Sequence, residues 1–341
     1  MIRLPPERLR RTIRQALLRR GLSPEHADFV TDGLVGTSLR GIDTHGIRLL
    51  PTYLAELDGG RARARPELTW RAGGRSVRAL DAGGALGLVA GTVACREAVV
   101  LARENGVGAV SVANSNHFGA ASVYTLEMAR QGALGLSFTN SDALVAPAGG
   151  RHPLFGTNPL SLAVAGADGE LFCVDMATSQ VAYSKVKSHR ERGLPLEPGW
   201  ALTPEGRDAA IADATEIGAL QPLGGYKGQC LGMIVEILCT LLAGMPFDHE
   251  LTHLYAPPYD APRQVAHLFL AFDLAAFGDP EAFRTRLAGL LALVREQETG
   301  AAERVINPGD LEREAERERE REGIPVSDEE AAFFAGLEGE G

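Results

Sequence analysis

Apolar side chains recur at helical spacing through the N-terminal part of the chain. Within residues 5–20 they stand four residues apart, which predicts an amphipathic helix. Ser23 followed by Pro24 is typical of a helix start, so we expect a second helix that ends near Leu39. A third helix is expected over residues 47–57. The pattern therefore predicts that the N-terminal segment is helical.

The middle of the chain alternates between strand-like and helix-like segments, which favours an α/β core. The expected strands are residues 76–80, 107–112, 133–139, 160–164 and 265–271, and the expected helices are residues 86–103, 118–131 and 279–298. No G-x-G-x-x-G sequence lies between a strand and a helix, and no G-x-x-x-x-G-K-[ST] sequence occurs. Neither a Rossmann fold nor a P-loop is therefore supported.

Three segments of the C-terminal half carry expectations about exposure. Residues 191–208 are rich in proline, glycine and polar residues, which predicts an exposed excursion. The apolar run at residues 230–243 predicts a buried helix. Residues 311–322 mix acidic and basic side chains in helical register, which is typical of a solvated helix. Ser327 followed by Glu330 then predicts a capping box for a last short helix.

Composition narrows the functional classes. The chain has 341 residues, of which 45% are hydrophobic, and a formal net charge of -10. This acidic balance argues against nucleic acid as the main partner. No apolar run reaches the roughly 18 residues that a membrane-spanning helix needs, and the N-terminus lacks the apolar centre of a signal peptide. The four cysteines form no C-x-x-C pair, which favours buried thiols in a reducing cytoplasm.

A polar turn with one histidine separates the strand expected at residues 107–112 from the helix that follows it. His117 could titrate near neutral pH, and the small residues after it would let a flat ligand approach the backbone. A turn between a buried strand and a helix start is held by the scaffold while it stays reachable. The alternative is that His117 is only a capping or hydrogen-bonded side chain.

A second polar cluster follows the second expected helix. Thr44 and His45 are adjacent, Asp43 precedes them, and Arg48 and Tyr53 lie on the element that follows. A hydroxyl, an imidazole, a guanidinium and a phenol can together bind a small carboxylate and move a proton. In the alternative interpretation, Asp43 or Thr44 caps a helix and His45 is incidental.

Later turns offer further ligand groups. Asn140 and Thr157 lie in turns that are rich in amides, hydroxyls and glycine. Residues 175–178 follow an apolar run and predict a polar helix cap, which suits a cofactor phosphate. Lys227, near glycines at the start of an apolar helix, is a second candidate phosphate ligand. Equally, each of these segments could be only a tight loop.

His249, Glu250 and His253 match the H-E-x-x-H pattern of zinc hydrolases. That chemistry needs both imidazoles on one face of a sustained helix, with the glutamate as base and a third metal ligand. Pro246 and Pro257 leave little room for such a helix. We interpret the pattern as a chance match, predict no metal site, and keep a zinc hydrolase as a remote alternative.

Taken together, these clusters resemble the type 2 malate/L-lactate dehydrogenase family, which also includes ureidoglycolate, sulfolactate and diketogulonate oxidoreductases and cyclic-imine reductases. The resembling pieces are Asp43-Thr44-His45-Gly46 with Pro51 and Tyr53, Asn116-His117-Phe118-Gly119, Gly156-Thr157-Asn158-Pro159, Asp175-Met176-Ala177-Thr178-Ser179, Gly225-Tyr226-Lys227-Gly228, and Asn307-Pro308-Gly309-Asp310. Each piece is weak alone. They occur in the family's order across nearly the whole chain, and that order makes the resemblance specific.

The resemblance implies a non-Rossmann α/β fold, with a mixed-sheet core of residues 73–306 and a helical lobe built from residues 1–72 and 307–341. It implies the cofactor NAD, or NADP, and a homodimer with the site near the subunit interface. It assigns His45 with Thr44 to a proton relay. His117 is expected to be a second acid/base and also to contact the dinucleotide. The other residues expected to hold the dinucleotide are Phe118, Gly119, Ala120, Ala121, Asp175, Met176, Ala177, Thr178, Lys227, Asn307, Pro308 and Gly309.

The substrate contacts expected from the resemblance are Arg48, Tyr53, Asn140 and Thr157. The family commonly places its carboxylate-binding arginine four residues after the first histidine, where this chain has Leu49, so Arg48 is the candidate. Lys185 is expected to assist catalysis, and it stands where the imine-reductase branch tends to have aspartate. That difference favours a small 2-hydroxy acid such as malate or L-lactate over a cyclic imine or diketogulonate. We therefore expect a cytoplasmic NAD(P)-dependent 2-hydroxyacid dehydrogenase without a nucleic-acid or membrane partner.

Overall fold

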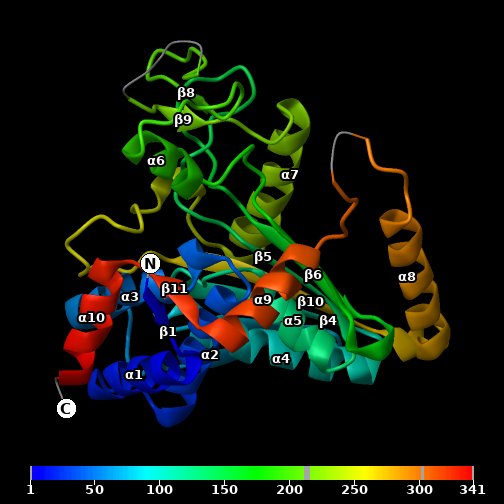
Figure 1. The fold of residues 1–341 in the computed structure, drawn as a ribbon. Helices are drawn as coiled ribbons and strands as arrows, with labels where there is room; N and C mark the ends of the chain where they lie inside the picture. Colours follow the sequence, from blue (N-terminus) through cyan, green and yellow to red (C-terminus); the bar gives the residue numbers. More distant parts are fainter. Residues whose placement is uncertain (1, 211–215, 301–302, 340–341) are drawn as a thin grey trace.

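A mixed sheet of seven strands forms the centre of the protein (Figure 1). The computed structural model describes residues 2–210, 216–300 and 303–339. In spatial order the strands are β2 (Thr69–Ala72), β3 (Val77–Asp81), β4 (Val107–Ser115), β10 (Val265–Asp273), β5 (Ala133–Thr139), β6 (Leu160–Ala165) and β7 (Leu171–Met176). Strands β3 and β4 pair in parallel, whereas the other neighbours are antiparallel. The predicted α/β class with a mixed-sheet core is confirmed.

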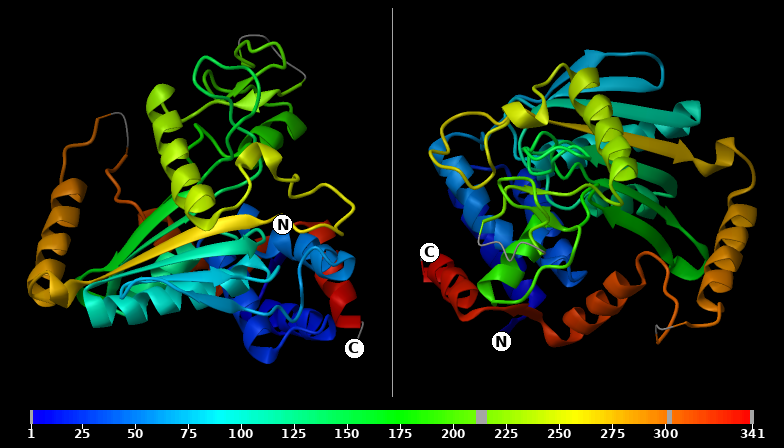
Figure 2. Two further views of the ribbon diagram at one scale, coloured as in Figure 1. Left: turned by 180° about the vertical axis from the view of Figure 1, so that it is seen from behind. Right: turned by 90° about the horizontal axis from the view of Figure 1, so that it is seen from above.

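Helices cover both faces of this sheet, as the views in Figure 2 show. On one face, α4 (Gly87–Asn105) lies against β4 and β10, and α5 (Ser122–Arg130) lies against β5 and β6. On the other face, α7 (Tyr226–Glu236) and the π-helix η4 (Ile237–Leu241) contact β5 and β10. A Cβ on Gly108 of β4 would come within 2.0 Å of the Ala98 carbonyl oxygen. Small residues therefore let α4 pack directly onto the sheet.

The two ends of the chain meet in a helical region beside the sheet (Figure 1). Its elements are β1 (Ile2–Leu4), which pairs with β11 (Ile324–Val326), and the helices α1 (Pro6–Arg19), α2 (Pro24–Leu39), α3 (Leu50–Gly59), α9 (Asp310–Glu322) and α10 (Asp328–Gly339). The predicted helix starts are confirmed. Ser23 Oγ accepts a hydrogen bond from the His26 amide, and Ser327 and Glu330 form the reciprocal bonds of a capping box.

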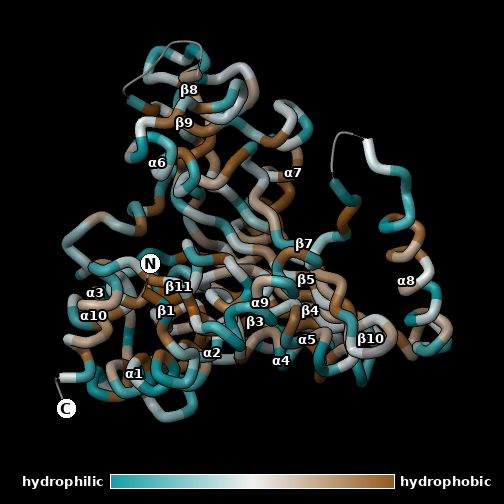
Figure 3. Tube along the Cα trace, in the orientation of Figure 1, coloured by the Kyte–Doolittle hydropathy of each residue, from teal (hydrophilic) through white to brown (hydrophobic). Residues whose placement is uncertain are grey.

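One apolar core runs from α1 and α2 to α4 and β4, and Figure 3 shows apolar residues along the central strands. The division into residues 1–72 with 307–341 and residues 73–306 stays a prediction. Parts of both segments, namely residues 1, 211–215, 301–302 and 340–341, lie outside the described residues. Within the described residues, no helix combines the length and apolar character needed to cross a membrane.

Residues 191–208 form the expected exposed excursion over most of their described length, but part of the segment helps to build a second, smaller core. Ala201 and Thr203 are buried. The short strands β8 (Ala201–Leu202) and β9 (Ala219–Leu220) pair with each other. Together with α6 (Tyr183–Glu191), which contributes Val186, they enclose this core above the sheet (Figure 1).

The expected burial of residues 230–243 is confirmed for one face of the helix and wrong for the other. The run does form α7 and η4, but Ile234 and Leu242 are 50% and 61% exposed. A helix that lies on a sheet covers it with one face, and these apolar side chains lie on the other face. A second apolar surface lies on the side of α8 (Pro280–Arg295) that faces the strands. Figures 1 and 2 show that α8 stands away from the sheet. A cavity of about 890 Å³ separates α8 from the strands.

Candidate active site

The turn that carries His117 links β4 to α5 and is anchored by Asn116. The Asn116 amide group donates to the carbonyl oxygens of Gly84 at 3.1 Å and Ala85 at 3.0 Å. Because Asn116 is fully buried, these bonds fix the position of the residue that follows. Gly119 adopts a left-handed φ of 74°, which lets the chain turn back toward α5. The half-buried His117 imidazole therefore lies on a rigid turn.

The second polar cluster lies on a short 3-10 helix, η1 (Asp43–His45), between α2 and α3. Thr44 Oγ1 lies 3.0 Å from His45 Nδ1. Asp43 forms an ion pair with Arg319 of α9, with 3.1 Å between Oδ2 and Nη2, and no side chain caps η1. The alternative capping interpretation is therefore wrong. Instead, the C-terminal part of the chain fixes the loop that carries His45.

The two predicted histidines face each other across the site. The ring centres of His45 and His117 lie 5.7 Å apart, and the ring planes are inclined by 27°. Tyr53 of α3 is fully buried and places its hydroxyl 2.9 Å from His117 Nδ1. The Gly119 amide lies 3.4 Å from the same nitrogen. Side chains from distant segments of the sequence thus form one cluster.

Burial sets the protonation states in this cluster. Loss of water lowers the pKa of His117 well below its usual value, and the charges of His45 and Arg263 act in the same direction. Burial also lowers the pKa of His45, although the carboxylate of Asp175 opposes this shift. The pKa of Tyr53 is raised well above its usual value, mainly by burial. Both imidazoles are therefore neutral near pH 7, and a neutral imidazole can accept a proton.

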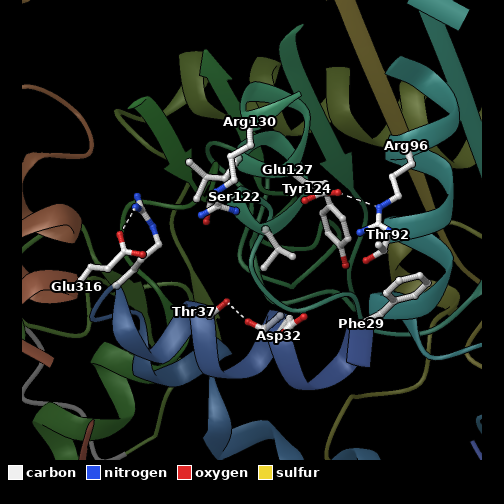
Figure 4. A pocket seen from close by; sticks show the side chains of 15 residues that line it. Phe29, Asp32, Thr37, Thr92, Arg96, Ser122, Tyr124, Glu127, Arg130 and Glu316 are labelled. Carbon is white, nitrogen blue, oxygen red and sulfur yellow. Dashed lines mark hydrogen bonds and ion pairs between the residues drawn. The ribbon is translucent and has the colours of Figure 1, made fainter. Parts of the chain in front are cut away.

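Asp175 lies near the end of β7 and connects the histidines to α5. Its Oδ2 accepts a hydrogen bond of 2.8 Å from the amide of Ser122, the first residue of α5. Burial raises the pKa of Asp175, whereas Ser122, His45 and Arg40 oppose the shift. Arg40 also lines a cavity of about 130 Å³ between α2, α4 and α5, and Ser122 and Tyr124 are among the other lining residues labelled in Figure 4. Polar groups therefore surround this carboxylate on several sides.

Thr157 lies in a tight turn before β6. Its amide donates to Ser141 Oγ at 3.0 Å, and its carbonyl accepts from the amide and hydroxyl of Thr178 at 2.8 and 3.0 Å. The expected helix cap at residues 175–178 is wrong, because α6 begins only at Tyr183. The polar residues after β7 bind the Thr157 turn instead of capping a helix.

Asn140 offers an unused hydrogen-bond donor. Its Oδ1 accepts a bond of 2.8 Å from the Ala266 amide of β10. Its Nδ2 is buried and has no hydrogen-bond partner among the described residues. An unpaired buried donor is costly, so this position suits an acceptor oxygen of a ligand.

Arg263 is a buried cation that the sequence analysis missed. It is 2% exposed, it is ion-paired with Asp142, and its Nε donates to the Thr252 carbonyl oxygen at 3.0 Å. Its charge lowers the pKa values of both His117 and Tyr53. The charge of the guanidinium therefore reaches the histidine cluster, although its hydrogen bond and ion pair are made to Thr252 and Asp142.

His267 is a second missed residue, and it supports the His117 turn from below. Its Nδ1 lies 2.7 Å from Thr139 Oγ1, and its Nε2 lies 2.8 Å from Ser115 Oγ. The ring stacks on Phe118 with 4.7 Å between the ring centres. A histidine inside the otherwise apolar run at residues 265–271 was the available sequence signal.

The expected cations Arg48, Lys185 and Lys227 are placed apart from the histidines. Arg48 Nε is ion-paired with Glu330 Oε1 of α10 at 2.7 Å. Lys185 Nζ lies 4.7 Å from the centre of the Trp200 ring, above the second core. Lys227 is exposed at the second position of α7. None of the three has a hydrogen bond or ion pair to the histidine cluster within the described chain.

The last expected cofactor turn, residues 307–309, lies against β7. Asn307 is buried and donates to the Leu291 carbonyl oxygen at 2.9 Å. Gly309 has a φ of 92°, and a Cβ there would lie 3.3 Å from the Cys173 amide nitrogen. Since Cys173 and Asp175 are two residues apart on β7, the turn lies on the strand that leads to the site.

The H-E-x-x-H segment does not form the helix that zinc chemistry requires. Its η5 (Asp248–Glu250) is a single 3-10 turn, and Leu251 continues in an extended conformation. Glu250 accepts a bond of 2.8 Å from the Phe247 amide. His253 Nε2 lies 3.7 Å from Asp142 Oδ2. Across the described ranges, no group of three or more His, Cys, Asp or Glu side chains could hold a metal ion.

Comparison with known proteins shows relatives along nearly the whole chain. A family model described as malate/L-lactate dehydrogenase matches residues 4–333. The chain is 34% identical over 298 residues to the malate dehydrogenase of Pyrococcus abyssi, which covers 85% of this chain and 81% of that protein. It is 34% identical over 278 residues to the (2R)-3-sulfolactate dehydrogenase (NADP(+)) of Chromohalobacter salexigens, with 82% of each chain covered. It is 31% identical over 329 residues to a ureidoglycolate dehydrogenase (NAD(+)) of Escherichia coli, with 96% and 93% covered.

Solved structures share the fold over the same length. The malate dehydrogenase from Entamoeba histolytica has a TM-score of 0.92 at 26% identity, covering 99% of this chain and 97% of that chain. The delta1-piperideine-2-carboxylate reductase from Pseudomonas syringae has a TM-score of 0.86 at 26% identity, covering 99% and 100%. The resemblance seen in the separate motifs is thereby confirmed. This chain belongs to the malate/L-lactate dehydrogenase family and is an oxidoreductase.

Proposed function

We propose that this protein transfers a hydride between NAD(P) and C2 of a small 2-hydroxy acid such as malate or L-lactate. The observation that carries the proposal is the half-buried pair of neutral imidazoles, His45 and His117, on which the charge of the buried Arg263 acts. Oxidation at C2 requires that the hydroxyl proton leave together with the hydride, so a neutral base must stand near a cation that holds the carboxylate. The relatives described above are named as dehydrogenases of malate, sulfolactate and ureidoglycolate.

In this proposal His117 receives the proton of the substrate hydroxyl. In the tautomer that this step requires, the hydrogen is on Nδ1, which donates to the Tyr53 oxygen instead of accepting from the Gly119 amide, and Nε2 is left as the acceptor. His45, hydrogen-bonded to Thr44, is the second member of the relay. Because a positive charge on His45 disfavours one on His117, the pair holds one added proton at a time. In the reverse direction that proton returns to the oxo group.

Arg263 is our candidate to hold the substrate carboxylate. Its charge acts on both His117 and Tyr53, and an arginine can bind a carboxylate through two N–H groups. Arg263 is itself paired with Asp142, but Arg48 and Lys185, the candidates from sequence, are held by their partners in α10 and at Trp200, apart from the histidines. We keep both as secondary candidates, with Asn140 and Thr157 as polar contacts of the substrate.

The residues around the histidines fit a nicotinamide dinucleotide. The unpaired Asn140 Nδ2 can donate to a ligand oxygen, and Gly119 leaves the backbone of the turn without a side chain. When bound, the nicotinamide takes up or supplies the hydride. We propose NAD as the cofactor, with NADP as the alternative, since relatives are named for each. The other proposed contacts are Phe118 through its backbone, Ala120, Ala121, Asp175, Met176, Ala177, Thr178, Lys227, Asn307, Pro308 and Gly309.

Reduction of a cyclic imine carboxylate is a second candidate reaction. The likeness to the delta1-piperideine-2-carboxylate reductase, at a TM-score of 0.86, supports it. Lys185 argues for the 2-oxo acid, because the imine-reductase branch tends to have aspartate at this position. A panel of substrates separates the two reactions.

We also propose a homodimer. The outer faces of α7 and η4 expose Ile234, Ile237, Leu241 and Leu242, each close to or above half exposed. A contiguous apolar surface of this kind is typical of an interface between subunits. The four cysteines of the chain are free thiols, three of them buried, which fits the reducing cytoplasm expected from the sequence.

The test of the proposed function is oxidation of NADH and NADPH against oxaloacetate, pyruvate, sulfopyruvate, diketogulonate and a cyclic imine carboxylate. The proposal expects turnover with at least one 2-oxo acid and a preference for one cofactor. Turnover with the imine alone would show that the interpretation of Lys185 is wrong. No turnover with any of them, while the reduced cofactor still binds, would contradict the proposed substrate class.

A further inference from the structure

Two carboxylic acids, Glu236 and Asp248, are buried beneath the turn that carries Thr157. Glu236 ends α7 and is 7% exposed, whereas Asp248 begins η5 and is 0% exposed. Asp248 Oδ2 accepts hydrogen bonds from the Gly156 amide and from Asn158 Nδ2, both at 2.7 Å. Glu236 Oε1 accepts from the Asp248 amide at 3.1 Å. The two acids therefore hold both chain neighbours of Thr157.

The surroundings of these acids fit one shared proton. The polar groups that act on Glu236 are Asp248 and Asn158, and neither is a cation. Asp248 Oδ1 is buried and has no hydrogen-bond donor in the described part of the chain. A proton on Glu236 supplies this donor and removes the repulsion between two buried negative charges. In agreement, burial and the neighbouring carboxylate raise the pKa of Glu236 to about 9.

The Thr157 turn depends on such an anchor. Asn158 has a φ of 40°, in the left-handed region that few residues other than glycine and asparagine adopt. A Cβ on Gly156 would come within 2.3 Å of Ser141 Oγ, so the turn is packed tightly against its neighbour. The Thr157 hydroxyl lies 3.4 Å from the same Ser141 oxygen. A small displacement of either neighbour would therefore move the Thr157 hydroxyl.

We propose that Glu236 and Asp248 share one proton and act as positioning residues that fix the Thr157 hydroxyl at the substrate. The proposal rests on the proposed function, in which Thr157 contacts the substrate. It also accounts for two local features. Glu236 stands directly before the π-helix η4, and such widened turns are frequent at functional sites. Asp248 stands directly before the H-E-x-x-H sequence, whose short turn brings it to Glu236.

The shared proton makes the turn sensitive to high pH. The titratable groups facing Glu236 are Asp248 and, on its own helix, the Cys239 thiol, whose pKa is raised by burial and by both acids. Folding raises the pKa of Glu236 from about 4.5 to about 9. Its contribution to stability is therefore full below about pH 4.5 and is lost as the pH rises through about 9. Above that pH the second negative charge loosens the turn and weakens substrate binding.

The test compares the wild type with Glu236→Gln and with Glu104→Gln, a matched control on the exposed surface of α4. Glutamine reproduces the uncharged acid but cannot ionise. In the wild type and the control, KM for the preferred 2-oxo acid should be about twofold above its neutral-pH value at pH 9 and about tenfold above it at pH 10, as for a single ionisation. Their Tm should fall between about pH 5 and 9. In Glu236→Gln, both the rise in KM and the fall in Tm with increasing pH should be smaller than in the wild type.

Each readout can overturn a different part of the proposal. A Glu236→Gln variant with the wild-type fall in Tm would overturn the shared proton. A flattened Tm profile combined with the wild-type rise in KM would overturn the positioning of Thr157. The Tm profile needs no substrate, so it separates failure of this acid pair from failure of the proposed function.

Discussion

Replacing Tyr53 by phenylalanine removes one hydroxyl from the site and leaves a buried ring in place. That hydroxyl lies 2.9 Å from His117 Nδ1, and Tyr53 is 0% exposed. Water therefore has little access to replace the lost partner. If Tyr53 orients the imidazole as proposed, Tyr53→Phe changes catalysis much more than it changes packing.

The expected loss in Tyr53→Phe follows from one neutral hydrogen bond. Such a bond contributes about 1 kcal/mol net, so kcat/KM should fall about fivefold. Loss of the acceptor for Nδ1–H also disfavours the imidazolium, so the acidic limb of the profile for hydroxy-acid oxidation should move to lower pH. The Tm should fall by only about 1–2 °C, because a change of about 1 kcal/mol has this effect in a chain of 341 residues.

Steady-state kinetics across pH and a thermal melt measure these changes together. Tyr183→Phe on α6 is the matched control, since Tyr183 is 39% exposed and its hydroxyl has no hydrogen-bond partner in the described ranges. An unchanged kcat/KM in Tyr53→Phe would refute an orienting role for this hydroxyl. A loss of activity that is explained by a large fall in Tm would also refute this role.

Three further predictions concern cations, acid stability and metal. Arg48→Ala should change KM for the 2-oxo acid by less than about threefold, because the surface ion pair of Arg48 with Glu330 contributes little. Arg263→Lys should raise KM by about tenfold or more, because lysine cannot bind the carboxylate at two points. A larger effect of Arg48→Ala than of Arg263→Lys would restore Arg48 as the carboxylate ligand. The arginines around Asp310, chiefly Arg295, hold the pKa of Asp310 at about 2. The contribution of Asp310 to stability is therefore present above about pH 4 and is lost as the pH falls through about 2. The Tm of Asp310→Asn should depend less on pH in this range, and equal Tm profiles of variant and wild type would exclude Asp310 and its arginines as the cause. A chelator should leave turnover unchanged, and a loss that zinc restores would revive the hydrolase alternative.

The individual clusters could be predicted because each is visible in a short stretch of sequence. His117 follows an apolar strand, and Thr44 and His45 follow the end of a helix. Their meeting could not be predicted from the stretches themselves, because the packing of α3 against the His117 turn brings Tyr53 to a residue 64 positions away. Arg263 escaped notice because an arginine before a strand resembles a surface residue until its burial against Asp142 is seen.

Exposure was the least predictable property. The run at residues 230–243 is apolar around the helix, and its period does not show that the sheet covers only one face. The polar composition of residues 191–208 likewise does not indicate that β8 pairs with β9, because 16 residues lie between the two strands. In both segments the missing information was which distant element lies next to the run.

Turnover of the His45→Gln and His117→Gln variants tests most directly whether the histidine pair transfers the proton. With saturating cofactor and the best 2-oxo acid of the panel, kcat should fall by about a hundredfold or more in at least one variant, the range for a lost general acid or base. Unchanged melting behaviour and retained binding of the reduced cofactor would show that the variants are folded. Near-normal kcat in both folded variants would contradict the proposed site.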